Sequence, residues 1–279
     1  RGWLALDTSL PAIEIGDPSR SGGLGTVIAS DNDEYPVGST LFGMTGWQED
    51  AVMGPGSNPI PDGIDPTAAL SVFGVTGLTA YFGLLDVSRP VEGETVLVSG
   101  AAGATGSVVG QIAKIKGCRV GGIAGSDEKC AWLTDELGFD AAINYRTEQV
   151  APAIRAACPN GVDVFFDNVG GDILEAAIGN LALRGRVVLC GAIATYNDTT
   201  PRPGPNNLSL LISQRGRMEG FIILDYMSRA NEAIAELAGW VMAGDVEFAV
   251  DVVDGLENAP AALDRLFTGA NQGKVMVRL

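Results

Sequence analysis

The sequence predicts an α/β protein with a doubly wound parallel sheet of six strands and a second, β-rich domain. Three features support this prediction. From residue 94 onward short apolar runs alternate with helical segments, a glycine-rich loop follows the first run, and the residues before about 66 are rich in Gly and Pro. Strands with apolar residues at successive positions are typical of a parallel sheet that helices cover on both faces. A chain of 279 residues also fits two domains, at about 150 residues each.

The first part of the chain, residues 1–66, is expected to form short strands joined by turns. Its β-like runs are 24–30, 40–43 and 46–53. The segment 55–66 is rich in Pro and Gly and therefore marks a domain border. Two helices are expected after this border, at 67–73 and 75–85.

The alternating part is expected to form the six-stranded sheet, with a helix after most strands. The predicted strands are 95–99, 119–124, 141–145, 162–167, 186–190 and 218–224. The predicted helices are 108–116, 127–137, 150–157, 173–183 and 208–214. This order fits a dinucleotide-binding (Rossmann) domain, which we expect over residues 67–244.

The C-terminal part is expected to hold a long amphipathic helix at 227–243, a strand at 249–253, a helix at 258–267 and a last strand at 274–279. Because this strand follows the dinucleotide domain, we expect it to return to the β-rich domain and close it. The β-rich domain would then comprise 1–66 and 245–279. The chain starts at Arg1 directly in an apolar run, so we expect this domain to be incomplete at its N-terminus.

The composition excludes several classes of function. Lys and Arg total 18 and Asp and Glu 34, a net charge of −16, which argues against nucleic acid or an anionic membrane as partner. No uninterrupted apolar run is long enough to span a membrane. The chain has no histidine, which removes Ser–His and Cys–His nucleophile pairs and His-ligated metal sites. Its four cysteines include no CxxC pair, so we expect no metal site, and free thiols in a reducing cytoplasm.

A glycine-rich loop follows the predicted strand 95–99 and precedes a helix. Set against the pattern G-x-G-x-x-G, Ala101 takes the first glycine position, while Gly103 and Gly106 keep the second and third. Glycine at the second position lets a pyrophosphate approach the backbone, and glycine at the third lets the helix pack close to the strand. The start of the helix supplies free N–H groups for an anion. The loop therefore indicates dinucleotide binding, with a merely structural tight turn as the alternative.

The residues at the end of the second predicted strand, 119–124, indicate which nicotinamide dinucleotide the chain binds. NAD sites place an Asp or Glu there for the ribose 2′-hydroxyl, but this strand ends in Ala124-Gly125-Ser126, without a carboxylate. Lys129, one of four lysines in the chain, follows in the first turn of the next helix. Ser126, the N–H groups of that helix start and Lys129 would suit a 2′-phosphate, so we expect NADPH rather than NADH. The alternative is a solvated lysine near Asp127.

Several segments resemble a known family. They are 103–114, 167–171 (DNVGG), 190–197 (CGAIATYN), 46–49 and 269–274. These segments are similar to the zinc-independent branch of the medium-chain dehydrogenase/reductases. Within it they resemble the leukotriene B4 12-hydroxydehydrogenase/prostaglandin reductase family, with its alkenal and curcumin double-bond reductases. The resemblance covers essentially the whole chain and implies that the β-rich domain is GroES-like, with Arg1–Gly2 as the tail of a Tyr-Met-Arg-Gly-type segment.

The resemblance also implies which residues contact the cofactor. Gly103, Ala104, Thr105 and Gly106 would meet the pyrophosphate, Lys129 the 2′-phosphate, and Tyr145 the adenosine. The other implied contacts are Asn168, Cys190, Gly191, Ala192, Ile193, Tyr196, Phe221, Ile222, Ile223 and, from the first domain, Asn271. Three of these residues have structural alternatives: Tyr196 as a turn tyrosine, Asn168 as the former of an Asx turn, and Tyr145 as a cap of the core at a strand end.

The implied reaction is a 1,4-reduction, in which NADPH delivers hydride to the β-carbon of an α,β-unsaturated aldehyde or ketone. The enolate oxygen that develops needs a donor, for which a ribose hydroxyl positioned by Tyr196 is the candidate. Tyr226 is the candidate proton donor, with water, or a Tyr226 that only packs on the core, as alternatives. Rival functions are NADPH:quinone reduction and NADPH binding without turnover, as a structural or regulatory protein.

A homodimer joined through the dinucleotide domains is also expected. The family resemblance implies it, and the apolar residues 221–224 would lie on the sixth strand, at an open edge of the sheet. An unpaired apolar edge is either covered or paired with another chain. We therefore predict a homodimer, although the sequence alone does not show whether this edge is covered by the same chain or paired with a second one.

Overall fold

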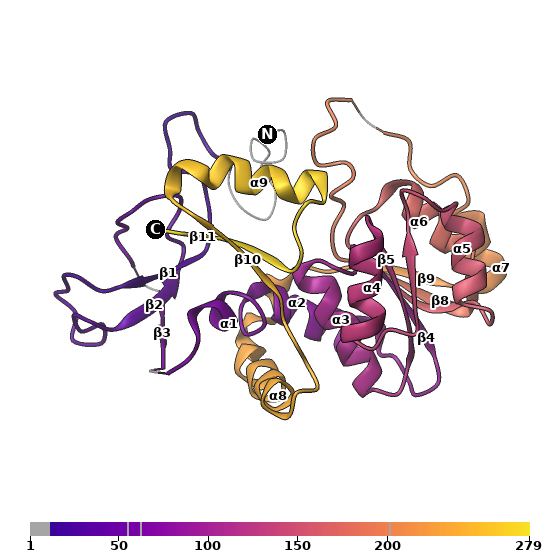
Figure 1. Ribbon diagram of the computed structural model, residues 1–279, viewed down its shortest axis with the longest axis horizontal. Helices are drawn as coiled ribbons and strands as arrows, with labels where there is room; N and C mark the ends of the chain where they lie inside the picture. Colours follow the sequence, from indigo (N-terminus) through magenta and orange to yellow (C-terminus); the bar gives the residue numbers. More distant parts are fainter. Residues whose placement is uncertain (1–11, 55, 62, 201) are drawn as a thin grey trace.

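The computed structural model describes residues 12–54, 56–61, 63–200 and 202–279, so Arg1–Gly2 lies outside the described residues. Figure 1 shows the large sheet and its helices on the right and three short strands on the left. The C-terminal segment with β10, α9 and β11 lies between them. This arrangement brings residues from both ends of the chain to one side of the large sheet.

The large sheet has six strands, all of which pair in parallel. In spatial order they are β6 (Ala141–Asn144), β5 (Arg119–Ala124), β4 (Thr95–Ser99), β7 (Val162–Asp167), β8 (Leu181–Leu189) and β9 (Arg217–Gly220). The chain winds outward from β4 in one direction and from β7 in the other. The carboxyl ends of β4 and β7 therefore form the point where ligands of doubly wound sheets bind, and the predicted fold class is confirmed.

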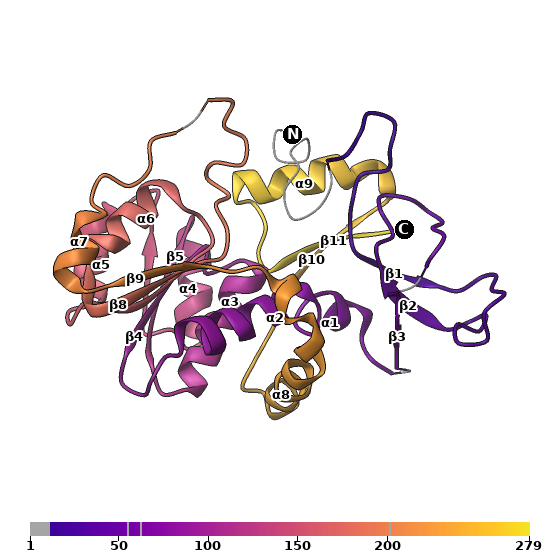
Figure 2. The same ribbon diagram turned by 180° about the vertical axis from the view of Figure 1, so that it is seen from behind.

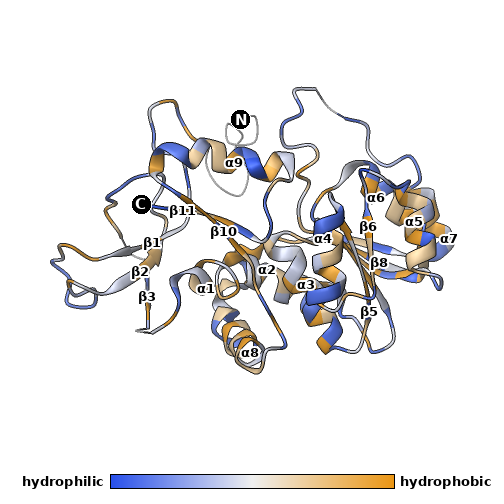
Figure 3. Ribbon diagram, viewed as in Figure 1, coloured by the Kyte–Doolittle hydropathy of each residue, from blue (hydrophilic) through white to orange (hydrophobic). Residues whose placement is uncertain are grey.

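Helices cover both faces of this sheet because its strand residues alternate between two cores. On one face Val96 and Val98 pack in a core with Phe82, and on the other Leu97 packs in a core with Ile178. The first face carries α2 (Val75–Phe82), α3 (Ala104–Ile115), α4 (Asp127–Ala131) and α8 (Ala230–Ala243). The second carries α5 (Val150–Ala157), α6 (Gly171–Ile178) and α7 (Ser209–Gln214). Figure 3 shows α8 coloured largely as apolar, and Ala233 and Leu237 are its buried residues.

The β-rich part differs from its prediction in one strand. The antiparallel strands β1 (Gly23–Thr26), β2 (Thr40–Gly43) and β3 (Asn58–Ile60) form the small sheet, and α1 (Pro66–Leu70) follows. The predicted strand at 46–53 is wrong. Gly46 has a φ of +66°, a left-handed conformation, and Trp47 N–H donates to Ser19 O at 2.9 Å. The chain therefore turns there, and the third strand forms after the turn.

The sixth strand is shorter than predicted, because β9 ends at Gly220 and a 3₁₀ turn spans Ile223–Arg229. Phe221 leaves the edge and packs against Phe166 and Tyr226, with ring centroids 6.4 and 6.2 Å apart. The expectation that 221–224 forms an apolar sheet edge is therefore wrong. Figure 2 shows β9 from behind, next to β8 and near α7.

The C-terminal strands pair with each other. β10 (Val250–Asp254) and β11 (Lys274–Arg278) form a two-stranded parallel sheet around α9 (Ala259–Thr268). Among the described residues, β11 pairs with β10 and with none of the strands of the small sheet. Gly273 instead bridges to Gly103, and its N–H donates to Ala102 O at 2.9 Å. The division into 1–66 with 245–279 and 67–244 stays a prediction.

Candidate functional site

The glycine-rich loop has the geometry of an anion-binding helix start. Helix α3 begins at Ala104, and its N-cap is Gly103, which has no side chain to occupy the first turn. A Cβ on Gly106 would lie 2.4 Å from Gly100 O, so only glycine lets the helix approach the strand this closely. The N–H groups of Ala104 and Thr105 belong to the first turn, where no helical acceptor exists. These groups and the helix dipole favour a negatively charged ligand.

A segment from the end of the chain contacts this loop. Gly273 has a φ of +67°, and a Cβ there would lie 2.0 Å from Ala249 O. Asn271 is buried, and its amide nitrogen donates to Gly273 O at 3.0 Å. Asn271 therefore fixes the turn that brings Gly273 onto Ala102. The structure places this predicted site residue beside the phosphate loop, with its amide engaged in the turn.

The end of β5 leads into the start of α4. Ser126 is the N-cap of this helix, and its hydroxyl accepts the N–H of Lys129 at 3.3 Å. The ammonium of Lys129 donates to Gly269 O at 2.8 Å. Burial lowers the pKa of Lys129, and so does the nearby Arg146. Asp127 instead accepts from Asn144, at 2.7 Å, so Lys129 and Asp127 have different partners.

Two further residues approach from the end of β6. The ring of Tyr145 packs against Gly125. A Cβ on Gly125 would lie 3.0 Å from the Tyr145 hydroxyl. Arg146 Nη2 donates to Thr268 O at 2.7 Å, and its guanidinium carbon lies 5.9 Å from the centre of the Tyr145 ring. Arg146 is not among the residues expected from the sequence, although it directly follows the predicted contact Tyr145. Its carbonyl partner lies 122 residues further along the chain, and no local pattern reports such a contact.

The carboxyl ends of β4 and β7 are joined by a buried network. The hydroxyl of Ser99 donates to Asp167 Oδ1 at 2.7 Å, and Asp167 also accepts the N–H groups of Val169 and Gly170. Burial raises the pKa of Asp167 although these donors oppose the shift. The side chain that accepts N–H groups two and three residues later, as in an Asx turn, is therefore Asp167 and not Asn168. The amide of Asn168 instead donates to Ser99 O at 2.7 Å. Sequence reasoning missed Ser99 and Asp167.

The segment after β8 folds back on the same strand ends. The N–H groups of Cys190 and Gly191 both donate to Asp167 O, at 2.9 and 3.0 Å. Burial, with the Asp167 carboxylate as a smaller cause, raises the pKa of Cys190 to about 12, so its thiol is protonated at neutral pH. The hydroxyl of Tyr196 accepts the N–H of Ala192 at 3.1 Å. Ala192 and Tyr196 therefore belong to one closed turn at the edge where the phosphate loop lies.

Of the other predicted residues, Phe221 and Tyr226 lie in an aromatic cluster. The Tyr226 ring stacks on Phe82 with centroids 4.9 Å apart, and Phe221 packs edge-on against Tyr226. A Cβ on Gly83 would lie 2.5 Å from the Phe221 ring, so Gly83 makes room for it. Burial raises the pKa of Tyr226, with Asp86 as the next cause. Ile222 and Ile223 follow Phe221 into the 3₁₀ turn and are half-buried.

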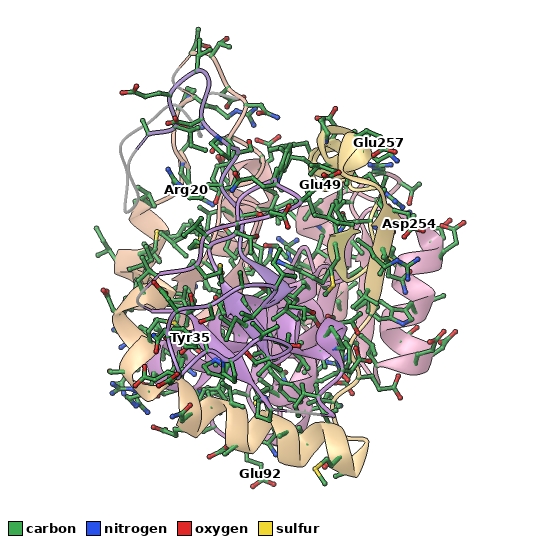
Figure 4. The ribbon with its side chains drawn as sticks, turned by 90° about the vertical axis from the view of Figure 1, so that its left-hand side faces the viewer. Arg20, Tyr35, Glu49, Glu92, Asp254 and Glu257 are labelled. Carbon is green, nitrogen blue, oxygen red and sulfur yellow. The ribbon has the colours of Figure 1, made fainter. Side chains whose placement is uncertain are left out.

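A separate groove of about 1620 Å³ lies in the β-rich part, between β2, α9 and β11. None of the candidate cofactor residues lines it, so the site is defined by the strand ends and not by this groove. Figure 4 views this side, with Tyr35 and Asp254 to either side of the small sheet. Within the described residues no three or more His, Cys, Asp or Glu side chains gather as a metal site. In that same part of the chain, no helix is long and apolar enough to cross a membrane.

Comparison with known proteins gives two family matches. Residues 104–239 match a family described as zinc-binding dehydrogenase, and residues 1–60 match one described as the N-terminal domain of oxidoreductase. The chain is 39% identical to the NADPH-dependent curcumin reductase of Escherichia coli, over 100% of this chain and 83% of that enzyme. It is 41% identical to the NADP(+)-dependent 2-alkenal reductase of Nicotiana tabacum, over 94% of this chain and 77% of that enzyme.

A solved structure is also similar. CurA of Vibrio vulnificus in complex with NADPH matches with a TM-score of 0.93 and 39% identity, over 98% of this chain and 83% of that one. The similarity thus extends over nearly the whole chain.

Proposed function

The chain belongs to the zinc-independent branch of the medium-chain dehydrogenase/reductases, and on that premise we propose that it reduces carbon–carbon double bonds with NADPH. Its substrates are α,β-unsaturated aldehydes and ketones, as the names of the alkenal and curcumin reductases suggest. One observation carries the proposal. The phosphate loop and the end of β5 lie on the same edge of the sheet, and the end of β5 has no carboxylate but is followed by Ser126 and Lys129.

The residues present fit NADPH. The N–H groups of Ala104, Thr105 and Gly106 would hold the pyrophosphate, because the N-cap Gly103 has no side chain that would compete for these N–H groups. Ser126 and Lys129 would hold the 2′-phosphate, and Tyr145 the adenosine. Toward the nicotinamide the proposed contacts are Cys190, Gly191, Ala192, Ile193, Tyr196, Phe221, Ile222 and Ile223. Asn168 and Asn271 are further proposed contacts of the cofactor.

NADPH, when bound, supplies the hydride that reaches the β-carbon of the enone. The protein orients both partners and stabilises the oxygen on which negative charge develops. We assign this orienting role to Tyr196, whose hydroxyl lies in the turn at the carboxyl end of β8. Tyr226 remains the candidate proton donor. Its hydroxyl, like that of an ordinary tyrosine, is protonated at neutral pH, and water is the alternative donor.

Turnover on two substrate classes tests this function. Purified protein is given NADPH together with a 2-alkenal or with a quinone, and NADPH oxidation is followed. We expect higher kcat/KM on the alkenal, with the saturated aldehyde as product. Faster reaction with the quinone would favour NADPH:quinone reduction instead. NADPH binding with no oxidation on either substrate would favour a non-catalytic binding protein.

We also propose a homodimer in the cytoplasm. Strand β9 is the last strand of the large sheet, and four apolar side chains near it are exposed: Leu183, Leu208, Leu210 and Ile212. Apolar residues beside an open strand edge suit pairing with a second copy. All four cysteines are free thiols, which suits a reducing compartment. A monomer mass by light scattering at micromolar concentration would count against the dimer.

A further inference from the structure

Two cations approach the same short stretch of backbone. The Lys129 ammonium donates to Gly269 O at 2.8 Å, and Arg146 Nη2 donates to Thr268 O at 2.7 Å. A Cβ on Gly269 would lie 3.6 Å from Arg146 Nη2 and 3.8 Å from the Tyr145 hydroxyl. Lys129, Tyr145 and Arg146 come from two different elements, α4 and the end of β6, and they converge on Gly269.

This cluster of Lys129, Tyr145 and Arg146 carries two cationic side chains in a chain of net charge −16. The carboxylates around it have other partners. Asp251, which raises the pKa of Lys129, forms an ion pair with Arg265 at 2.8 Å. Asp127 accepts from the Asn144 amide, and Glu148 accepts from the Asn144 N–H. Neither Lys129 nor Arg146 forms an ion pair with a carboxylate of the described residues, so both charges are available to an anionic ligand.

Each cation keeps donors for a further acceptor. A lysine ammonium has three N–H bonds and an arginine guanidinium five, and each of these two makes one bond to a carbonyl of the described residues. The carbonyl bonds hold both side chains in place at the C-terminal end of α9. The planar guanidinium is suited to a bidentate contact with phosphate, whereas an ammonium acts as a point charge.

We propose that Arg146 is a second cation for the 2′-phosphate of NADPH and determines, with Lys129, the preference for NADPH over NADH. This inference rests on the proposed function, because it concerns the same cofactor. Its physical basis is the position of Arg146. Both Arg146 and Lys129 bind carbonyls at the end of α9, and Arg146 lies over the Tyr145 ring. That ring packs on Gly125, the residue before Ser126. A residue at this place meets the one group by which the two cofactors differ.

Binding of two small probes tests the role of Arg146 apart from catalysis. Adenosine 2′,5′-bisphosphate and adenosine 5′-monophosphate differ only in the 2′-phosphate, and calorimetry gives the Kd of each. For Arg146→Ala we expect about a tenfold weaker bisphosphate affinity and an unchanged monophosphate affinity. Arg146→Lys keeps the charge and should lose only about threefold, because an ammonium lacks the bidentate fork. Arg155→Ala, an exposed arginine on α5, is the matched control and should change neither Kd.

The other outcomes overturn the inference in distinguishable ways. An equal loss for both probes, with a lower Tm, would make Arg146 only a cap of the α9 end. No change in either Kd would remove it from the site altogether. If the unaltered protein binds both probes equally, or neither, the choice of NADPH itself fails, and the proposed function loses its cofactor.

Discussion

The hydroxyl of Ser99 donates to the carboxylate of Asp167 across the carboxyl ends of β4 and β7, at 2.7 Å, where both side chains are fully buried. The same hydroxyl accepts the N–H of Asn168 at 2.9 Å. The Ser99 hydroxyl oxygen thus joins the two central strands, β4 and β7, at the point where the strand order of the sheet reverses. Asp167 O in turn holds the N–H groups of Cys190 and Gly191, so the pair positions three strand ends at once.

Replacing Ser99 by Ala should therefore destabilise the protein. The change leaves the buried Asp167 carboxylate without one donor and the half-buried Asn168 N–H without its acceptor. We expect a loss of about 2–3 kcal/mol in the free energy of unfolding, measured by urea denaturation. Ser88→Ala is the matched control, because this buried hydroxyl donates only to Leu84 O within its own turn. A loss as large in the control would mean that burial alone, and not the strand junction, decides the effect.

Lys129→Ala should weaken NADPH and leave NADH nearly unchanged. The ammonium is half-buried and held at Gly269 O, and a charge-assisted contact to phosphate is worth roughly 1.5–3 kcal/mol. We expect NADPH affinity to fall at least tenfold in a fluorescence titration. Lys116→Ala serves as control, because that ammonium lies over the Trp240 ring, 5.4 Å from its centre. Equal losses for NADPH and NADH would show that Lys129 does not meet the 2′-phosphate.

Part of this site could be predicted from the sequence and part could not. The glycine loop, Ser126 and Lys129 are local patterns at strand ends, and the structure places them at one sheet edge. Arg146 was missed because its partner Thr268 is distant in sequence. The strand predicted at 46–53 failed because Gly46 turns the chain through a left-handed conformation. The extension of β9 to 224 failed because a run of apolar residues fits a strand and a core-facing turn equally well.

Tyr196→Phe tests the tyrosine assigned to the reaction. Its hydroxyl accepts the N–H of Ala192, so the change removes one bond of the turn as well as the proposed contact to the ribose. If the contact acts as charge develops on the substrate oxygen, kcat should fall about tenfold with little change in NADPH affinity. The measurement is steady-state turnover of an enone, with deuterated NADPH to establish that hydride transfer limits the rate. An unchanged kcat under that condition would leave Tyr196 as a turn residue only.

Glu94→Gln should reduce stability in a pH-dependent way. Burial raises the pKa of Glu94, but Arg186 and the N–H of Val91 lower it more, so it lies below its ordinary value. A lowered pKa in the folded state stabilises the protein above the unfolded value of 4.5, and that contribution is lost as pH falls through the folded pKa. We expect a loss of about 2 kcal/mol at pH 7 that shrinks below pH 4.5, measured by urea denaturation at several pH values. A difference independent of pH would contradict this.

The position of the transferred hydrogen tests the central claim most directly. Purified protein is incubated with an enone and with NADPH that carries deuterium on the transferring carbon, and the product is examined by NMR. We predict one deuterium on the β-carbon, an intact carbonyl group and a saturated carbon–carbon bond. Deuterium on the carbonyl carbon, with an alcohol as product and the double bond retained, would contradict the account.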